Sequence, residues 1–345
     1  MFKFVPQVSS EIVFDHLPKS IQESASVRNL SEEKSTVSLQ FARKRFFRLY
    51  TESGPDIHLS FGRELEKAFE RTKSFYGVLP KYTCKPLFLI KKDDFMLFGQ
   101  EFFEGSPIDT LYEKSELTSS EVENILAEIR DIFAGLERQS TEELKKSEFD
   151  NFCKIVLSND AFSKIDTSII KSEIIPIIES GILNLKPTIR WSSGDLSARN
   201  ILIQNKKNFK IIDFEFAHKT HFHQEDWIRL ATFSTPAFKE ISFINKLKKE
   251  ISNELHLFHL LRQTILNRHV YDQVEYRKYL QDDLISILKK IFGKSKIKSQ
   301  ILEGFSTHNQ LLEGIINNNA QKNAELLGSN AKLIDSINEL ADKNS

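Results

Sequence analysis

The chain has 345 residues, 40% of them apolar, and its formal net charge is zero. The apolar content is ample for a packed core in two lobes, and the balanced charge argues against a protein that binds nucleic acid through its overall charge. Two cysteines and the absence of a signal-peptide pattern favour a reducing, cytoplasmic environment, with the inner face of the membrane as an alternative location.

The first hundred residues favour a small sheet-rich lobe. Residues 36–50 are rich in β-branched and aromatic side chains, which predicts two strands joined by a turn. Helical spacing of the apolar residues predicts a helix over residues 60–77, and two more strands are expected over 85–90 and 95–103. The expected order is strand, strand, helix, strand, strand, in a small lobe over residues 1–106.

Residues 107–303 are expected to form a larger, mostly helical lobe. Thr118 or Ser119 is the candidate N-cap of its first long helix, because acidic residues and a helical apolar pattern follow. Three short strands interrupt the helices: one ends at Trp191, and the next two form a hairpin around the turn at 205–208.

The last segment, residues 304–345, has a different pattern. Apolar residues and asparagines alternate at spacings of four and three from Leu312 to Leu340, which predicts a coiled coil. We therefore expect a homo-oligomer formed through this tail. The alternative is an amphipathic helix that packs back on the body of the protein.

Three polar residues at the ends of the predicted strands indicate phosphoryl transfer. Asp195 follows Gly194 at the end of a strand, where a carboxylate could accept the proton of an attacking hydroxyl. Asn200 opens the hairpin and Asp213 closes it, so the hairpin brings two oxygen ligands suited to magnesium together. A base beside a metal fits phosphoryl transfer, in which catalysis depends mainly on positioning the reactants and neutralising the phosphate charge.

The stretch "GDLSARNILI…KIIDFEFA" resembles the catalytic and metal-binding motifs of the aminoglycoside phosphotransferase and choline kinase superfamily. The family pattern is His-Gly-Asp, four residues, Asn, then a hairpin to Ile-Asp-Phe/Trp-Glu. The resemblance implies an α+β, two-lobed protein-kinase-like fold, ATP and Mg²⁺ as cofactors, Asp195 as catalytic base, and Asn200 with Asp213 as metal ligands. It also implies that Asp226, in "QEDWIRL", supports the catalytic loop.

The resemblance further implies nucleotide-binding residues in the small lobe. The family places a phosphate-binding Lys on the second strand, and the matching position here is Arg48, with Lys44 as the alternative. The paired acid is Glu64, with Glu66 as second choice. Backbone groups from Glu101 to Phe103 are implied to hydrogen-bond adenine.

Three departures from the family pattern leave a second interpretation open. Arg48 stands in place of Lys, Ser193 stands in place of His, and the expected phosphate-covering loop, residues 21–35, contains no glycine. The alternative function is a weak or inactive pseudokinase scaffold that binds nucleotide and oligomerises through its tail.

The acceptor is expected to be a small molecule or glycan: a sugar, an amino alcohol or a polysaccharide end, as in lipopolysaccharide biosynthesis. His218, His221 and His223 are open to three interpretations, namely a metal site, an acceptor contact or ordinary loop residues. The basic segment 289–299 is either a solvated helix end or a surface for anionic glycans or peripheral membrane association.

Overall fold

The computed structural model describes residues 9–293, except for residues 24, 27–28, 34–43, 53–54, 64, 159–166, 207 and 267–273, and it also describes Glu303. The predicted coiled-coil tail, residues 304–345, lies outside the described residues, as does Glu64. Most of the basic segment 289–299 lies outside them too.

A five-stranded antiparallel sheet forms the first part of the chain, with the strand order β1-β2-β3-β5-β4. Its strands are β1 (Leu30–Glu33), β2 (Lys44–Leu49), β3 (Ile57–Gly62), β4 (Pro86–Lys91) and β5 (Met96–Glu101). Three helices accompany the sheet: α1 (Ser10–Asp15), α2 (Lys19–Gln22) and α3 (Glu66–Val78).

One strand of this sheet was missed in the sequence. The predicted helix over residues 60–77 begins only at Glu66, because Ile57–Gly62 forms a central strand that hydrogen-bonds β2 on one side and β5 on the other. Strand β1 lies inside the stretch 21–35 that was interpreted as the phosphate-covering loop. Among the residues that the structure describes before α3, there are therefore three strands rather than two.

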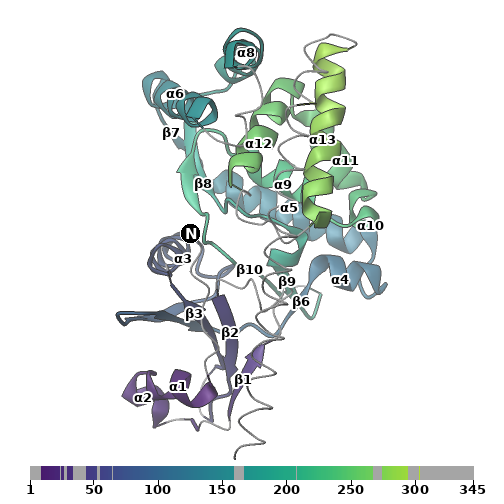
Figure 1. Cartoon of the computed structure of the whole chain (residues 1–345). Helices are drawn as coiled ribbons and strands as arrows, with labels where there is room; N and C mark the ends of the chain where they lie inside the picture. The colour runs from purple at the N-terminus through teal and green to yellow at the C-terminus, as the bar shows by residue number, and fades with distance from the viewer. Residues whose placement is uncertain are drawn as a thin grey trace, which may run out of the picture.

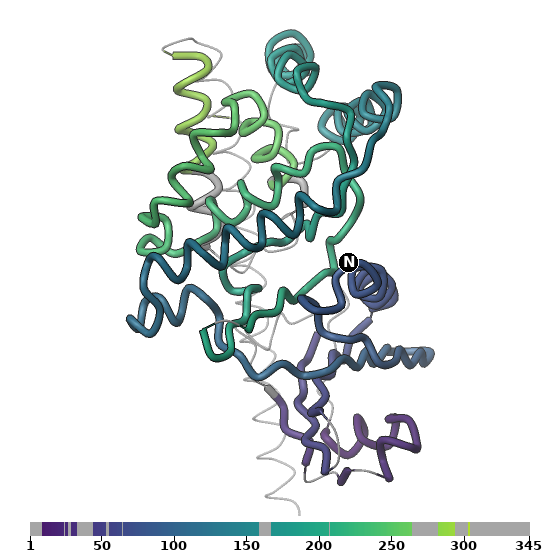
Figure 2. Tube along the Cα trace, turned by 180° about the vertical axis from the view of Figure 1, so that it is seen from behind, coloured from purple at the N-terminus to yellow at the C-terminus, as the bar shows by residue number. Residues whose placement is uncertain are grey.

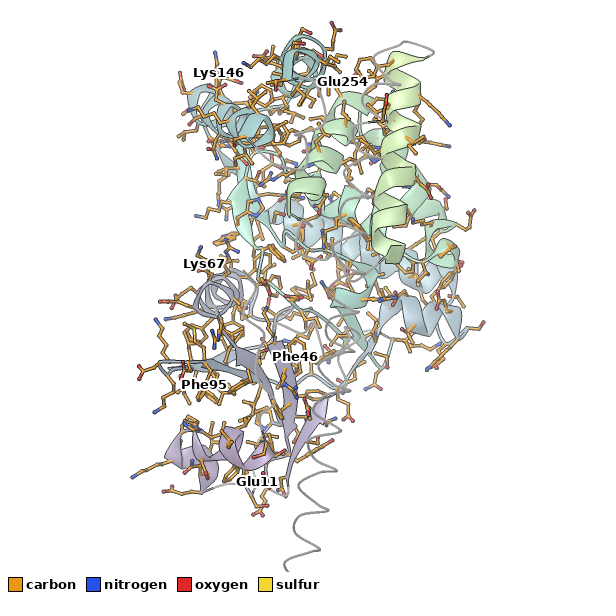
Figure 3. The ribbon with its side chains drawn as sticks, in the orientation of Figure 1. Glu11, Phe46, Lys67, Phe95, Lys146 and Glu254 are labelled. Carbon is orange, nitrogen blue, oxygen red and sulfur yellow. The ribbon has the colours of Figure 1, made fainter. Side chains whose placement is uncertain are left out.

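The two faces of the sheet have different surroundings. Phe47 and Leu49 of β2 pack with Leu59 of β3 and with Val13 and other apolar residues of the α1 region, which lies on the side away from the helical part (Figure 1). Because side chains alternate along a strand, Lys44, Phe46 and Arg48 belong to the opposite face. Figure 3 labels Phe46 on this face.

The second part of the chain is mostly helical and lies at the other end of the molecule (Figures 1 and 2). Its helices are α4 (Ile108–Glu113), α5 (Ser119–Gly135), α6 (Glu142–Ser158), α7 (Thr167–Ile169), α8 (Ile175–Leu183), α9 (Glu225–Phe233), α10 (Pro236–Lys239), α11 (Ser242–Glu250), α12 (Asn253–Leu266) and α13 (Val274–Phe292); a π-helical turn, Ile170–Ile174, connects α7 to α8. Thr118 caps α5 in a capping box with Glu121, as predicted.

Two small three-stranded sheets lie inside the helical part. The first pairs β9 (Ile201–Gln204) with β10 (Asn208–Ile211) and with β6 (Ser106–Pro107). The second pairs β8 (Thr188–Ser192) with β11 (His218–Thr220) and with β7 (Arg138–Gln139). The predicted hairpin is confirmed, and its turn uses positive φ angles of 53° at Asn205 and 61° at Lys206.

The largest hydrophobic core joins α3 to the helical part. Phe75 of α3 stacks on Phe214, with ring centroids 4.2 Å apart, and both belong to a cluster that includes residues of α5, β9 and α9. Phe214 follows Asp213, so this core fixes the end of the hairpin beneath the sheet. The predicted α+β architecture of a sheet-rich part and a helical part is confirmed. In the described part of the chain, no helix has both the length and the apolar character needed to cross a bilayer.

Candidate active site

The loop after β8 approaches the turn after β10 very closely. Gly194 has a φ of +70°, and a Cβ atom there would meet the backbone oxygen of Phe216 at 2.3 Å. Only glycine satisfies both the left-handed conformation and this approach without strain. Gly194 therefore allows the loop that carries Asp195 to lie against the turn that carries Asp213.

A buried carboxylate holds the same loop from below. Ser192 Oγ and Ser193 Oγ donate to Asp226 Oδ1 at 3.0 and 2.8 Å, and the same two hydroxyls accept from the backbone N–H of Gly194 and Asp195. Burial raises the pKa of Asp226 to about 6, and the neighbouring charge of Glu225 adds to the rise. Asp226 holds the loop, as predicted, and it does so through Ser192 and Ser193.

The three polar residues of the predicted site are held close together by hydrogen bonds. Asn200 Nδ2 donates to the backbone oxygen of Asp195 at 2.8 Å, which leaves the amide oxygen Oδ1 as the atom that a metal could take. The backbone N–H of Ile212 donates to Asn200 O at 2.9 Å, so Asp213 follows directly beside Asn200. Asp213 has a φ of 62°, a conformation that Asp tolerates better than most residues.

Negative charge is concentrated around these residues. Burial raises the pKa of Asp195 to about 7; the charge of Asp213 adds to the rise, and Arg229 opposes it. Asp213 keeps solvent access, yet desolvation between the two parts raises its pKa as well, while Lys44 opposes this rise and Glu215 adds to it. Crowded carboxylates with an amide oxygen beside them are a donor set that fits a hard divalent cation such as Mg²⁺.

Two cations contact these carboxylates. Arg229 of α9 donates from Nε to Asp195 Oδ1 and from its terminal nitrogen to Gln263 of α12, so it connects the base candidate to two helices. Lys44 of β2 forms an ion pair with Glu215, two residues after Asp213. Sequence reasoning missed Arg229; its one local signal is that it lies one helical turn after Asp226.

Comparison with solved structures gives the fold. The structure is similar to aminoglycoside phosphotransferase APH(4)-Ia, with a TM-score of 0.60 at 14% identity over 81% of this chain and 97% of that one. A ternary complex of a thermostable mutant of that enzyme with AMP-PNP and hygromycin B matches with a TM-score of 0.59 at 12% identity, over 81% of this chain and 99% of the other. No protein-family model and no curated protein matches the sequence.

The chain has the fold of an aminoglycoside phosphotransferase. This fold contains a sheet-rich part and a helical part, and it confirms the architecture that the motif predicted. At this level of identity the likeness extends to the fold alone.

Within the phosphotransferase fold, the structure places Arg48 away from the carboxylate cluster. Its Nε and terminal nitrogen donate to Asp56 Oδ2 at 3.0 and 2.7 Å, and its guanidinium lies 3.8 Å from the ring centroid of Phe102. Four residues of strand separate Arg48 from Lys44, which is about 13 Å. Arg48 therefore lies at the end of β2 next to the linker between the two parts.

In the linker between the two parts, residues 101–103, some backbone N–H groups already donate hydrogen bonds within the protein. The N–H of Glu101 donates to Lys85 O at 2.9 Å, and the N–H of Phe102 donates to Asp56 O at 2.7 Å. Neither N–H is therefore available to a nucleotide base, whereas these bonds do not involve the N–H of Phe103. The second-choice acid, Glu66, pairs with Lys91 of β4 at 2.5 Å.

The histidines near β11 take part in a buried polar network. His218 Nε2 lies 3.0 Å from Glu225 Oε1, and Arg262 lies 3.2 Å from the other oxygen of Glu225. Although burial by itself raises the pKa of Glu225, Arg262 and His218 hold it well below its ordinary value. His221 Nδ1 lies 2.7 Å from a carboxylate oxygen of Glu148. Among the described residues, no group of three or more His, Cys, Asp and Glu side chains is arranged to hold a metal ion.

Proposed function

We propose that the chain is an ATP- and Mg²⁺-dependent phosphotransferase that acts on a hydroxyl group of a small molecule or glycan. The observation that carries the proposal is that Asp195, Asn200 and Asp213 lie together, where the loop after β8 meets the two ends of the β9–β10 hairpin. Two hydrogen bonds, from Asn200 Nδ2 to Asp195 O and from Ile212 N to Asn200 O, hold the three residues there. The fold shared with a phosphotransferase that binds AMP-PNP supports it.

Asp195 is the proposed catalytic base. Its pKa of about 7 suits a group that is to accept a proton near neutral pH, because a base works best when its pKa lies close to the working pH. In this role Asp195 orients the acceptor hydroxyl and takes its proton as the oxygen attacks the γ-phosphorus, while the bond from the γ-phosphorus to the β,γ-bridging oxygen breaks and ADP leaves. Arg229 keeps part of the Asp195 population ionised at neutral pH.

Asn200 and Asp213 are the residues that would hold Mg²⁺, through the amide oxygen and the carboxylate. A bound divalent cation supplies neutralisation of the phosphate charge. For the nucleotide base, we propose the backbone of the linker from Glu101 to Phe103, with the N–H of Phe103 as the donor. Arg48 flanks this end of the site through its contact with Phe102.

The acceptor we propose is a sugar, an amino alcohol or a polysaccharide end. Known neighbours of this fold include enzymes named for small hydroxyl-bearing acceptors, namely aminoglycosides, and one was solved with hygromycin B. Oligomerisation through the tail, action at the cytoplasmic face of a membrane and a part in lipopolysaccharide biosynthesis belong to the same proposal.

The test is phosphate transfer from γ-labelled ATP to a panel of sugars, amino alcohols, aminoglycosides and isolated glycans, with Mg²⁺ and with a chelator. We expect labelled product from at least one class of acceptor, and its loss with the chelator. Wild-type protein that binds Mg·ATP and labels nothing across the panel would support the pseudokinase alternative instead.

A further inference from the structure

We propose that Ser140, His221 and Glu148 form a second catalytic site, which hydrolyses small carboxylic esters. Ser140 directly follows β7, His221 directly follows β11, and Glu148 lies in α6. Ser140 Oγ lies 2.8 Å from His221 Nε2, and Nδ1 of the same ring lies 2.7 Å from Glu148 Oε2. A serine, a histidine and a carboxylate connected in this order are the arrangement by which proteins turn a serine hydroxyl into a nucleophile.

The hydrogen-bond partners of His221 fix which ring nitrogen carries the proton. Glu148 accepts from the backbone N–H of His221 at 2.9 Å, from its ring Nδ1, and from the hydroxyl of Thr220. A carboxylate has no hydrogen to donate, so the imidazole proton is on Nδ1 and Nε2 keeps its lone pair. The hydroxyl of Ser140 therefore donates to Nε2, and its oxygen is the atom that becomes nucleophilic.

The serine is accessible, whereas the histidine is held inside the fold. Ser140 is half-buried, while His221 is only 3% exposed. The backbone N–H of Ser140 donates to Pro187 O at 2.8 Å, which extends the pairing of β7 with β8 by one residue. The strand pairing therefore holds the hydroxyl beside the imidazole, as a preorganised site requires.

The first turn of α6 supplies a donor for the charge that develops on the ester oxygen. The N–H of Leu144 donates to Thr141 Oγ1 at 3.3 Å and the N–H of Lys145 donates to Thr141 O at 3.2 Å, so Thr141 caps the helix. The N–H of Glu142 precedes these bonds and points out of the helix end, where negative charge is stabilised. The carboxylate of Glu142 is paired with Lys145 Nζ at 2.9 Å, which offsets its own charge.

A cavity of about 320 Å³ opens at the same end of α6. Glu142, Lys146 and Phe149 of α6 line one side, and Ile182 and Leu183 at the end of α8 line the other. Figure 3 labels Lys146. The apolar side chains suit the hydrocarbon part of an ester, and the volume is near the lower limit of ligand pockets, about 300 Å³. We therefore infer that the substrate is small.

This site is separate from the one that contains Asp195. Strand β7 pairs with Thr188 and Ile189 at the start of β8, whereas Asp195 follows the end of β8 at Ser192. The four residues of strand from Thr188 to Ser192 span about 13 Å. Figure 1 shows β7 and α6 on the side of the helical part that is away from the five-stranded sheet. The two sites therefore lie at opposite ends of β8.

The reaction runs in two steps through an acyl-serine. Ser140 Oγ bonds to the carbonyl carbon of the ester as His221 Nε2 takes the hydroxyl proton; the bond from this carbon to the alcohol oxygen then breaks, and His221 gives the proton to that oxygen. His221 next takes a proton from a water whose oxygen attacks the acyl carbon, and it returns the proton to Ser140 Oγ as the acid leaves. One ester and one water give one alcohol and one carboxylic acid.

The first test is the hydrolysis of p-nitrophenyl acetate, measured by the release of p-nitrophenolate in the absence of ATP and Mg²⁺. Ser140→Ala and His221→Gln should each lower the rate by about 100-fold or more, because each removes a member of the catalytic unit. The matched control is Ser158→Ala, at an exposed serine at the other end of α6, and it should keep the wild-type rate. Melting temperatures confirm that each variant is folded.

A fluorophosphonate probe tests the nucleophile in the wild type, without any substitution. The probe reacts covalently with an activated serine, and peptide mass spectrometry should find the adduct on Ser140. The proposal is overturned if the probe labels another residue or none, or if folded Ser140→Ala hydrolyses the ester as fast as Ser158→Ala does. Neither measurement involves ATP, so a failure here leaves the proposed phosphotransferase standing, and a failure of phosphate transfer leaves this site standing.

Discussion

Replacing Arg229 by Gln should shift the pH at which the proposed phosphotransferase becomes active. Arg229 donates directly to Asp195 and opposes the rise in its pKa, which burial brings to about 7. An opposite charge this close lowers the pKa of a carboxyl group by about 1 to 3 units, so removal of Arg229 should raise the pKa of Asp195; a rise of about 1 unit brings it to about 8, and a rise of about 2 units to about 9. Less of the base is then ionised at neutral pH.

The size of the effect follows from the fraction of ionised base. At about pH 7.5, a pKa of 7 leaves about three quarters of Asp195 ionised, whereas a pKa of 8 leaves about one quarter and a pKa of 9 about 3%. The expected loss of kcat/KM is therefore about 3-fold to 25-fold at this pH, and it should shrink as the pH rises above about 9.

The assay is the pH profile of kcat/KM for ATP with an acceptor from the panel. Arg138→Gln, at an exposed arginine, is the matched control and should leave the profile unchanged. Arg229→Lys should shift the profile less than Arg229→Gln, because it keeps the charge. A loss of the same size at every pH would refute the reasoning, since it would mean that Arg229 acts on the structure of the loop and not on the ionisation of Asp195.

Three further results are expected. Asp195→Asn should lower phosphate transfer by about 10² to 10⁴ while Mg·ATP binding measured by calorimetry stays close to that of the wild type, and unchanged transfer would exclude Asp195 as the base. Gly194→Ala should cost more than about 1 kcal/mol in urea unfolding, since φ is +70° and the new Cβ would meet Phe216, whereas Gly77→Ala in α3, with open space around it, should be neutral or stabilising. Burial lowers the pKa of His259 from 6.5 to about 3, so the unfolded chain takes up the proton first and stability falls as the pH drops from about 6.5 toward 3. Between about pH 7 and pH 5, the free energy of unfolding should fall by about 2 kcal/mol less in His259→Leu than in the wild type, as measured by urea unfolding at both pH values. An equal fall in the variant would show that His259 does not cause it.

Local patterns were sufficient for the elements whose hydrogen bonds close within a few residues. The N-cap at Thr118 could be predicted because its capping-box partner, Glu121, is only three residues away. The hairpin β9–β10 could be predicted because its turn and its two strands, with their alternating apolar and polar residues, are contiguous in the sequence. The placement of Asn200 and Asp213 at its two ends follows from that hairpin, so the central site motif was visible in the sequence.

Strand β3 could not be predicted from local patterns in the same way. Ile57–Gly62 runs directly into a stretch whose apolar residues have helical spacing. It forms a strand because it hydrogen-bonds to β2 on one side and to β5 on the other, and β5 follows only after α3 and β4 in the sequence. Because that strand was missed, the sequence could not determine which residue of β2 approaches the site. The tertiary structure places Lys44 beside Glu215 and Arg48 beside Asp56, at the two ends of β2.

The sequence by itself determined the two-part architecture and the loop and hairpin that carry Asp195, Asn200 and Asp213, since spacing and periodicity are properties of neighbouring residues. The tertiary structure alone decided which charges surround them. Arg229 meets Asp195 across 34 residues and Lys44 meets Glu215 across 171 residues. Such contacts depend on how α9 and the sheet pack against the hairpin, and no local pattern encodes that packing.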